Sequence, residues 1–231
     1  MIKGLRFLSS ALVIIFVFAC NNGDKESTAP EDQSDSVNIL ARTDSSFEVS
    51  GPAEGALQQW FSFIQPEYKL SIDSFVLTDI WVEDSLITEP FKPDSLYYPL
   101  YGKYLRYAPD SAYFVDLDSY NILLKETNGV VSGTVGGPDN LVFLIDKNNQ
   151  IKKRLLFNGP GTYIQDAWWI NNESVLLASI AEGDSMNRFE PVLWKINIVE
   201  DLFEKYEYCG ATLKMFPEYV EKVRFSGITV R

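Results

Sequence analysis

An internal repeat constrains the fold of this 231-residue chain more than any other feature. The segment RYAPDSAYFVD, residues 106–116, aligns with WWINNESVLLA, residues 168–178, so that Asp110 matches Asn172 at a turn. The segment FLIDKNNQIKKRLLF, residues 143–157, aligns in the same way with WKINIVEDLFEKYEY, residues 194–208. In every segment apolar residues flank a turn, so each copy contains two predicted β-hairpins.

Each copy therefore reads as a four-stranded antiparallel meander, over about residues 104–157 and 166–208. A meander of this length and strand order resembles a β-propeller blade. Because two blades cannot close a ring, the sequence predicts a mainly β fold with two propeller-like meanders, arranged as an incomplete propeller or a β-sandwich. Residues 68–100 are expected to add a third, irregular sheet, and Asn128–Asp139 a glycine-rich loop.

The expected burial pattern follows from where apolar and charged residues fall within the meanders. Leu141–Ile145 and Ser174–Ile180 are mostly apolar on consecutive residues, which predicts strands covered on both faces. The last strand of each copy carries charge, such as Lys152–Arg154 in the first and Glu204 in the second, and is expected to form an outer edge.

One or two short helices should accompany the sheets. Apolar residues recur at helical spacing from Leu57 to Ile64, and Pro66 should end this amphipathic helix. Phe216–Val223 is the second candidate helix, and Phe225–Val230 is expected to be a closing strand.

The N-terminus has the layout of an export signal. Lys3 and Arg6 precede an apolar run that is too short for a stable transmembrane helix, which needs about 20 residues. The run ends in VFAC, residues 17–20, which resembles the lipobox of Gram-negative bacterial lipoproteins. This resemblance implies a signal peptide over residues 1–19 and lipidation, including palmitate, at Cys20. The alternative is plain secretion, with cleavage after Ala19.

The segment behind the cysteine differs in composition from the rest of the chain. Residues 21–36 contain five acidic residues, one lysine and no aromatic or aliphatic residue larger than alanine, so they cannot form a core. We expect residues 20–45 to be the lipidated cysteine and a disordered acidic tether, followed by a single β-rich domain over 46–231. Asn21 after the cysteine resembles outer-membrane lipoproteins, so the expected partner is that membrane, bound on its periplasmic or cell-surface side.

Charge and residue usage exclude several classes of function. The net charge of −12 becomes −14 when residues 1–19 are removed, which argues against nucleic acid as a partner. The absence of histidine excludes Ser-His-Asp and Cys-His catalysis and histidine-ligated zinc. No phosphate-binding or dinucleotide-binding glycine motif is present, and no cofactor is predicted. If Cys20 is acylated, it forms no disulfide with Cys209, which we expect to be buried at a strand end.

Two groups of residues are candidates for binding. Asp116 and Asp118 share a face if the strand continues, and are weak candidates for a hard cation; a hydrogen-bonded strand end is the favoured interpretation. Tyr163, Asp166 and Trp168 lie at the junction of the copies and are candidates for binding a ligand such as a sugar ring.

Aromatic side chains at the junction of the copies, and in a run of tyrosines near the start of the first copy, can fill the core instead of binding a ligand. Trp169 is expected to pack inside, because adjacent residues on a strand face opposite ways. The tyrosines from Tyr97 to Tyr107 fill a core or line a binding face.

Together these features predict a lipid-anchored binding or structural module with a protein or glycan partner. The alternative is a carboxylate-based, glycan-active hydrolase or a glycan-binding protein. Hydrolysis would require two of Asp116, Asp118 and Asp166 to lie within about 5–10 Å of each other in a cleft.

Overall fold

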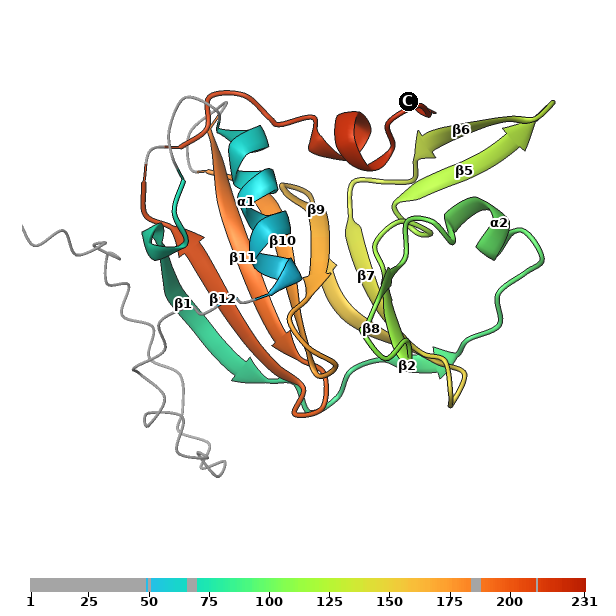
Figure 1. Cartoon of the computed structure of the whole chain (residues 1–231), viewed down its shortest axis with the longest axis horizontal. Coiled ribbons are helices and arrows are strands. Elements are labelled where there is room, and N and C mark those ends of the chain that lie inside the picture. The colour runs from blue at the N-terminus through green and yellow to red at the C-terminus, as the bar shows by residue number, and fades with distance from the viewer. Residues whose placement is uncertain (1–48, 50, 66–69, 184–187, 211) are drawn as a thin grey trace, which may run out of the picture. The chain divides into compact units, whose positions relative to one another are not determined.

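A computed structural model describes residues 49, 51–65, 70–183, 188–210 and 212–231 (Figure 1). All of them belong to one compact unit, Arg42–Arg231. The predicted signal peptide, Cys20 and the tether lie outside the described residues. None of the helices in the described part of the chain is long and apolar enough to cross a membrane.

The second repeat copy forms the core of the first five-stranded sheet (Figure 1). Its antiparallel strands are, in spatial order, β1 (Phe75–Val82), β12 (Leu202–Tyr208), β11 (Phe189–Asn197), β10 (Ser174–Glu182) and β9 (Thr162–Trp169). The four strands β9 to β12 follow one another in sequence and in space, so the predicted meander is confirmed.

The first repeat copy forms a second sheet with the same plan. Its antiparallel strands are, in spatial order, β2 (Thr88–Pro90), β8 (Ile151–Asn158), β7 (Asn140–Asp146), β4 (Tyr113–Asp116) and β3 (Arg106–Tyr107). Here too the predicted meander is present. The strands of the described residues do not close into a propeller.

The two copies contact each other directly at their first strands, β3 and β9. The indole N–H of Trp169 donates a hydrogen bond to the carbonyl oxygen of Arg106 at 2.7 Å. The amide N–H of Asp110 donates to the side-chain oxygen of Asn172 at 3.0 Å, so two residues that occupy equivalent turn positions are bonded to each other. The edge where the sheets meet is therefore fixed by polar contacts.

The main hydrophobic core lies between the two sheets. Val115, Val142 and Leu144 from the second sheet pack in one cluster with Val175 and Leu177 from the first. Trp169 belongs to the same cluster and is buried, as predicted. Because β7 and β10 are apolar on consecutive residues, each sheet also needs a cover on its other face.

Helix α1 (Pro52–Ile64) covers the other face of the first sheet (Figure 1). Pro52 stands in its first turn, where the missing N–H costs no hydrogen bond. Leu57 and Trp60 are fully buried against Leu176 and Ile180 of β10, so the predicted amphipathic face is confirmed. This packing explains why β10 is apolar on consecutive residues.

The segment between β2 and β3 covers the other face of the second sheet. Phe91 and Leu105 pack on Phe114, Phe143 and Ile145 of this face. The short helix α2 (Tyr97–Tyr101) lies within the same segment. Residues 68–100 therefore add one edge strand to each main sheet and a cover for the second, and the prediction that they form a third sheet is wrong. The last strands of the meanders, β8 and β12, lie in the interior of their sheets, because β2 and β1 pair with them on the outer side. The prediction that these charged strands form the outer edges is therefore wrong.

The loop predicted at Asn128–Asp139 is a hairpin. Strands β5 (Ile122–Thr127) and β6 (Val130–Val135) pair antiparallel on either side of Asn128 and Gly129, whose φ angles of 54° and 78° belong to a tight hairpin turn. The short strand β13 (Thr229–Val230) adds to β6 in parallel and completes a three-stranded sheet.

The C-terminal region contains one turn of π-helix, η3 (Val220–Arg224), which overlaps the second half of the helix predicted at Phe216–Val223. The predicted closing strand is limited to β13. Phe225 is fully buried, and its ring lies 4.2 Å from that of Tyr104. This aromatic contact holds the C-terminal segment against the chain around α2.

Candidate functional site

Asp116 ends strand β4 and organises the turn that follows. One of its carboxylate oxygens accepts the amide N–H groups of Asp118 and Ser119, both at 2.9 Å. The other accepts the hydroxyl of Ser119 at 2.5 Å and the phenol of Tyr97 at 2.6 Å. Such turns are typical of aspartate at strand ends, because its short side chain reaches the amides two and three residues further along the chain. With four donors, the carboxylate has no acceptor capacity to spare.

Tyr97 connects this turn to helix α2. Its ring is half-buried and packs edge-on against Phe91, with the centroids 5.4 Å apart. Burial, reinforced by the adjacent Asp116 carboxylate, raises the pKa of the Tyr97 phenol well above its ordinary value. The phenol is therefore protonated throughout the physiological pH range, and its proton is directed at Asp116.

A pocket of about 550 Å³ lies between the Asp116 turn and the segment around α2. We call it the Tyr97 pocket, and the residues that line it include Phe91, Tyr97, Leu100, Tyr101, Asp116 and Ser119. Its volume falls in the range of small-molecule sites, and its lining combines aromatic rings with a few oriented polar groups, as such sites do.

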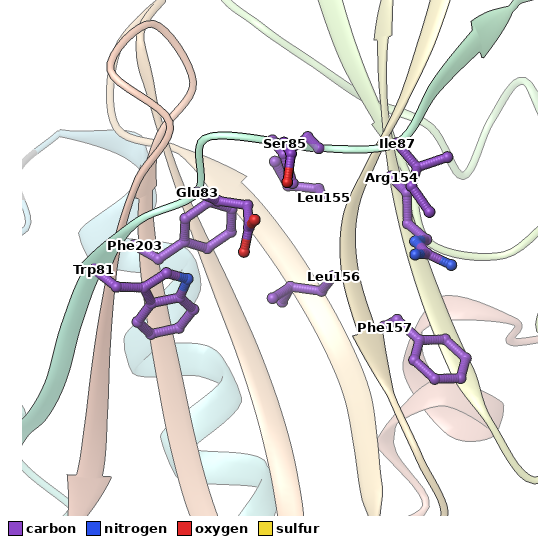
Figure 2. A pocket seen from close by; sticks show the side chains of 10 residues that line it. Trp81, Glu83, Ser85, Ile87, Arg154, Leu155, Leu156, Phe157 and Phe203 are labelled. Atoms are coloured by element: carbon purple, nitrogen blue, oxygen red, sulfur yellow. The ribbon is translucent and has the colours of Figure 1, made fainter. Parts of the chain in front are cut away.

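A smaller crevice of about 280 Å³ lies between the two main sheets, where β1 and β12 face β8 (Figure 2). Trp81 and Phe203 stack with ring centroids 5.1 Å apart on one side, and Leu156 faces them from β8. Arg154 and Phe157 project from the side of β8 turned away from Trp81. The crevice thus combines this apolar surface with the polar side chains of Glu83 and Ser85, which also line it.

Asp118 and Arg224 form a buried ion pair at the other end of the Asp116 turn. Both side chains are at most 3% exposed, and the Arg224 guanidinium donates to the Asp118 carboxylate. Arg224 also donates to the carbonyl oxygen of Gln165 at 2.9 Å. These contacts join η3 to β9 and to the end of β4.

Asp166, on β9, belongs to the same charged cluster. Its carboxylate accepts a hydrogen bond from Arg106 Nε at 2.8 Å and from the Tyr219 phenol at 3.2 Å. Arg224 Nε lies 3.9 Å from the same carboxylate. Two arginines therefore face two buried carboxylates, Asp118 and Asp166, and the cluster is close to neutral overall.

The pKa of Asp118 reflects its burial. Desolvation raises this pKa to about 6; the positive charge of Arg224 opposes the rise, and the neighbouring Asp116 carboxylate adds to it. Asp118 is thus ionised at neutral pH, and it takes up a proton at a higher pH in the folded chain than in the unfolded chain.

The three candidate carboxylates therefore have structural partners. Asp116 is saturated by four donors, and Asp118 and Asp166 are bound by arginines and are at most 4% exposed. The structure brings Asp118 and Asp166 together around Arg224, in the interior rather than in a cleft. Within the described residues, no group of three or more cysteine, aspartate or glutamate side chains is placed to hold a metal ion.

The remaining predicted ligand-binding residues lie on the first sheet, away from the Tyr97 pocket's lining. The Tyr163 phenol donates to Glu182 at 3.2 Å, and its ring packs edge-on against Phe216. Trp168 is partly buried in the core beneath α1. Neither residue lines the Tyr97 pocket or the crevice.

Of the two cysteines, Cys209 lies within the described residues. Cys20 lies outside the described residues, and its lipidation stays a prediction. Cys209 directly follows β12 and is exposed, so the prediction that it is buried is wrong. Its amide N–H donates to the carbonyl oxygen of Ser74, which continues the pairing of β1 with β12 by one residue and leaves the side chain outside the core.

Sequence reasoning missed the partners that define the site. Ser119 and Arg224 were not singled out, and Tyr97 was noted only as part of an aromatic run. A signal for Ser119 was available, since aspartate followed by serine in a turn favours side-chain bonds to nearby amides. Nothing local marks Arg224, whose carboxylate partner is 106 residues away.

No protein family, curated protein or solved structure was found that matches this chain.

The first prediction concerns the buried ion pair. Replacing Arg224 with methionine should lower the free energy of unfolding by about 3–5 kcal/mol, because a buried carboxylate loses its partner. Lys222→Met is the matched control: Lys222 forms an exposed pair with Glu218 on the same segment, and its loss should leave the stability essentially unchanged, because water screens this pair. Urea unfolding at neutral pH measures the free energy of unfolding of both variants. Equal losses of stability in the two would contradict the conclusion that the buried pair of Arg224 with Asp118 stabilises the fold.

The second prediction concerns pH. Because the pKa of Asp118 is raised to about 6, this group favours folding below its unfolded pKa near 4, and that contribution is lost as pH rises to about 6. Asp118→Asn should remove this pH dependence, which amounts to about 3 kcal/mol between the two limits. Urea unfolding across this window checks the slope. A variant whose stability follows the same slope as the parent would refute the role of Asp118.

Proposed function

We propose that this protein is a membrane-anchored lipoprotein that binds a small ligand at the outer membrane. Cys20 supplies the lipid anchor, the acidic segment behind it is the tether, and the β-rich domain carries the binding site. The Tyr97 pocket is the observation that carries the proposal, because it is the larger of the two hollows described above and has polar groups held in fixed orientation.

The arrangement of the carboxylates favours binding over hydrolysis. A glycoside hydrolase needs one carboxyl group as an acid and another as a base or nucleophile, both in reach of the substrate. Asp118 and Asp166 are buried against Arg224 and Arg106, and Asp116 is saturated by donors from its own turn and from Tyr97. These contacts leave none of the three positioned to exchange a proton with a bound substrate.

The anchor is tested by changing Cys20. In a Gram-negative host supplied with labelled palmitate, the full chain should incorporate label and sediment with outer membranes, whereas Cys20→Ser should do neither. Cys209→Ser serves as the control, since it removes the only other cysteine and should leave labelling unchanged. Retained label in Cys20→Ser, or its absence from the unchanged chain, would refute the lipoprotein assignment.

The pocket is tested with fluorotyrosine incorporated into the full chain purified in detergent. Among polar aromatic and polyol fragments, those that bind should shift the fluorine signal of Tyr97, which is assigned by its loss in Tyr97→Phe. The signal of Tyr163 should stay in place, because Tyr163 does not line the pocket. Shifts confined to Tyr163 would move the site to the junction of the repeats, and no shift at any tyrosine would refute the proposed function.

A further inference from the structure

The hydrogen bonds of Asp116 fix the direction of the protons around the Tyr97 pocket. An ionised carboxylate only accepts, so the Tyr97 phenol and the Ser119 hydroxyl must both donate to it. Each hydroxyl has a single proton, and that proton is used. What Tyr97 Oη and Ser119 Oγ retain for a ligand is therefore acceptor capacity only.

The other polar groups of the lining are largely committed to partners. The phenol of Tyr101 donates to the carbonyl oxygen of Ile122 at 2.9 Å and accepts the amide of Leu124 at 3.0 Å. Lys152 pairs with Glu89 at 2.7 Å and lies over the ring of Phe143. Tyr101 therefore contributes mainly ring surface, while the ammonium at the rim is already neutralised.

Charge around the pocket disfavours an anionic ligand. The Asp116 carboxylate lies directly behind both acceptor oxygens, and Asp94 stands at the rim with its carboxylate bonded to the amide of Leu96 at 2.8 Å. A ligand carboxylate or phosphate would bring its own acceptor oxygens against those of Tyr97 and Ser119. With Lys152 paired, Lys92 is the only lysine or arginine among the described lining residues that offers it an uncommitted positive charge.

We infer that the Tyr97 pocket takes a neutral polyhydroxylated ligand of the pyranose class, whose hydroxyls donate to Tyr97 Oη and Ser119 Oγ while its C–H face packs on the aromatic lining. The inference rests on the proposed function and names the ligand class of the same site. A sugar ring suits it because it presents several adjacent hydroxyl donors and one apolar face. The pocket supplies adjacent acceptors beside the rings of Phe91 and Tyr97.

The test uses neutral methyl pyranosides of glucose, galactose and mannose with the fluorotyrosine-labelled full chain. At least one should shift the Tyr97 signal, and its deoxyfluoro analogue that lacks the donating hydroxyl should bind more weakly. Ser119→Ala and Tyr97→Phe, followed by calorimetry, should each weaken binding about fivefold, because each removes one acceptor. Tyr98→Phe is the matched control and should bind as the parent does, since Tyr98 does not line the pocket.

The outcomes separate the ligand class from the proposed function. If fragments shift Tyr97 but no pyranoside does, or if uronates or simple amines bind more tightly than neutral sugars, the sugar inference falls while a binding function remains. If sugars bind to Ser119→Ala and Tyr97→Phe as tightly as they bind to the parent protein, the two hydroxyl oxygens are not the acceptors of the ligand, and the inferred geometry is wrong. If nothing shifts Tyr97, the proposed function falls as well.

Discussion

The burial of one guanidinium determines how the parts of this fold meet. Arg224 comes from the C-terminal turn, Asp118 follows a strand of the second sheet, and Gln165 and Asp166 lie on a strand of the first. Removing a charge from water costs several kcal/mol, so a side chain that is 2% exposed persists only where its partners stand in place. The ion pair therefore requires both sheets and the C-terminal segment to be assembled together.

What the sequence predicts well is local. The hairpins of both repeat copies, the apolar face of α1 and the inward packing of Trp169 follow from periodicity and turn residues within short windows. The β5–β6 hairpin also had a local signal in Asn128-Gly129, but further glycines in the same stretch favoured a loop. Partners far apart in sequence, such as Arg224 and Asp118, leave no pattern in a single chain. The short edge strand β2 also leaves none, because it carries too few residues to show alternation.

The fate of the Asp116 and Asp118 pair shows how turn chemistry overrides strand periodicity. On a continuous strand both carboxylates would share one face and could hold one cation. The strand instead ends at Asp116, because the amides of residues 118 and 119 fold back onto its carboxylate. The turn then directs Asp116 toward Tyr97 and Asp118 toward Arg224. The two carboxylates thus serve two different contacts, in agreement with the favoured interpretation of a hydrogen-bonded strand end.

The same turn places the proposed binding pocket next to the charged cluster. Asp116 orients the acceptors of the pocket, Asp118 anchors the C-terminal segment, and the backbone between them is shared. The Asp116 charge contributes to the raised pKa of Asp118, so the two carboxylates also interact electrostatically. The turn thus connects Arg224, which does not line the pocket, to Ser119, which does. The buried ion pair and the proposed ligand site therefore share the same short stretch of backbone.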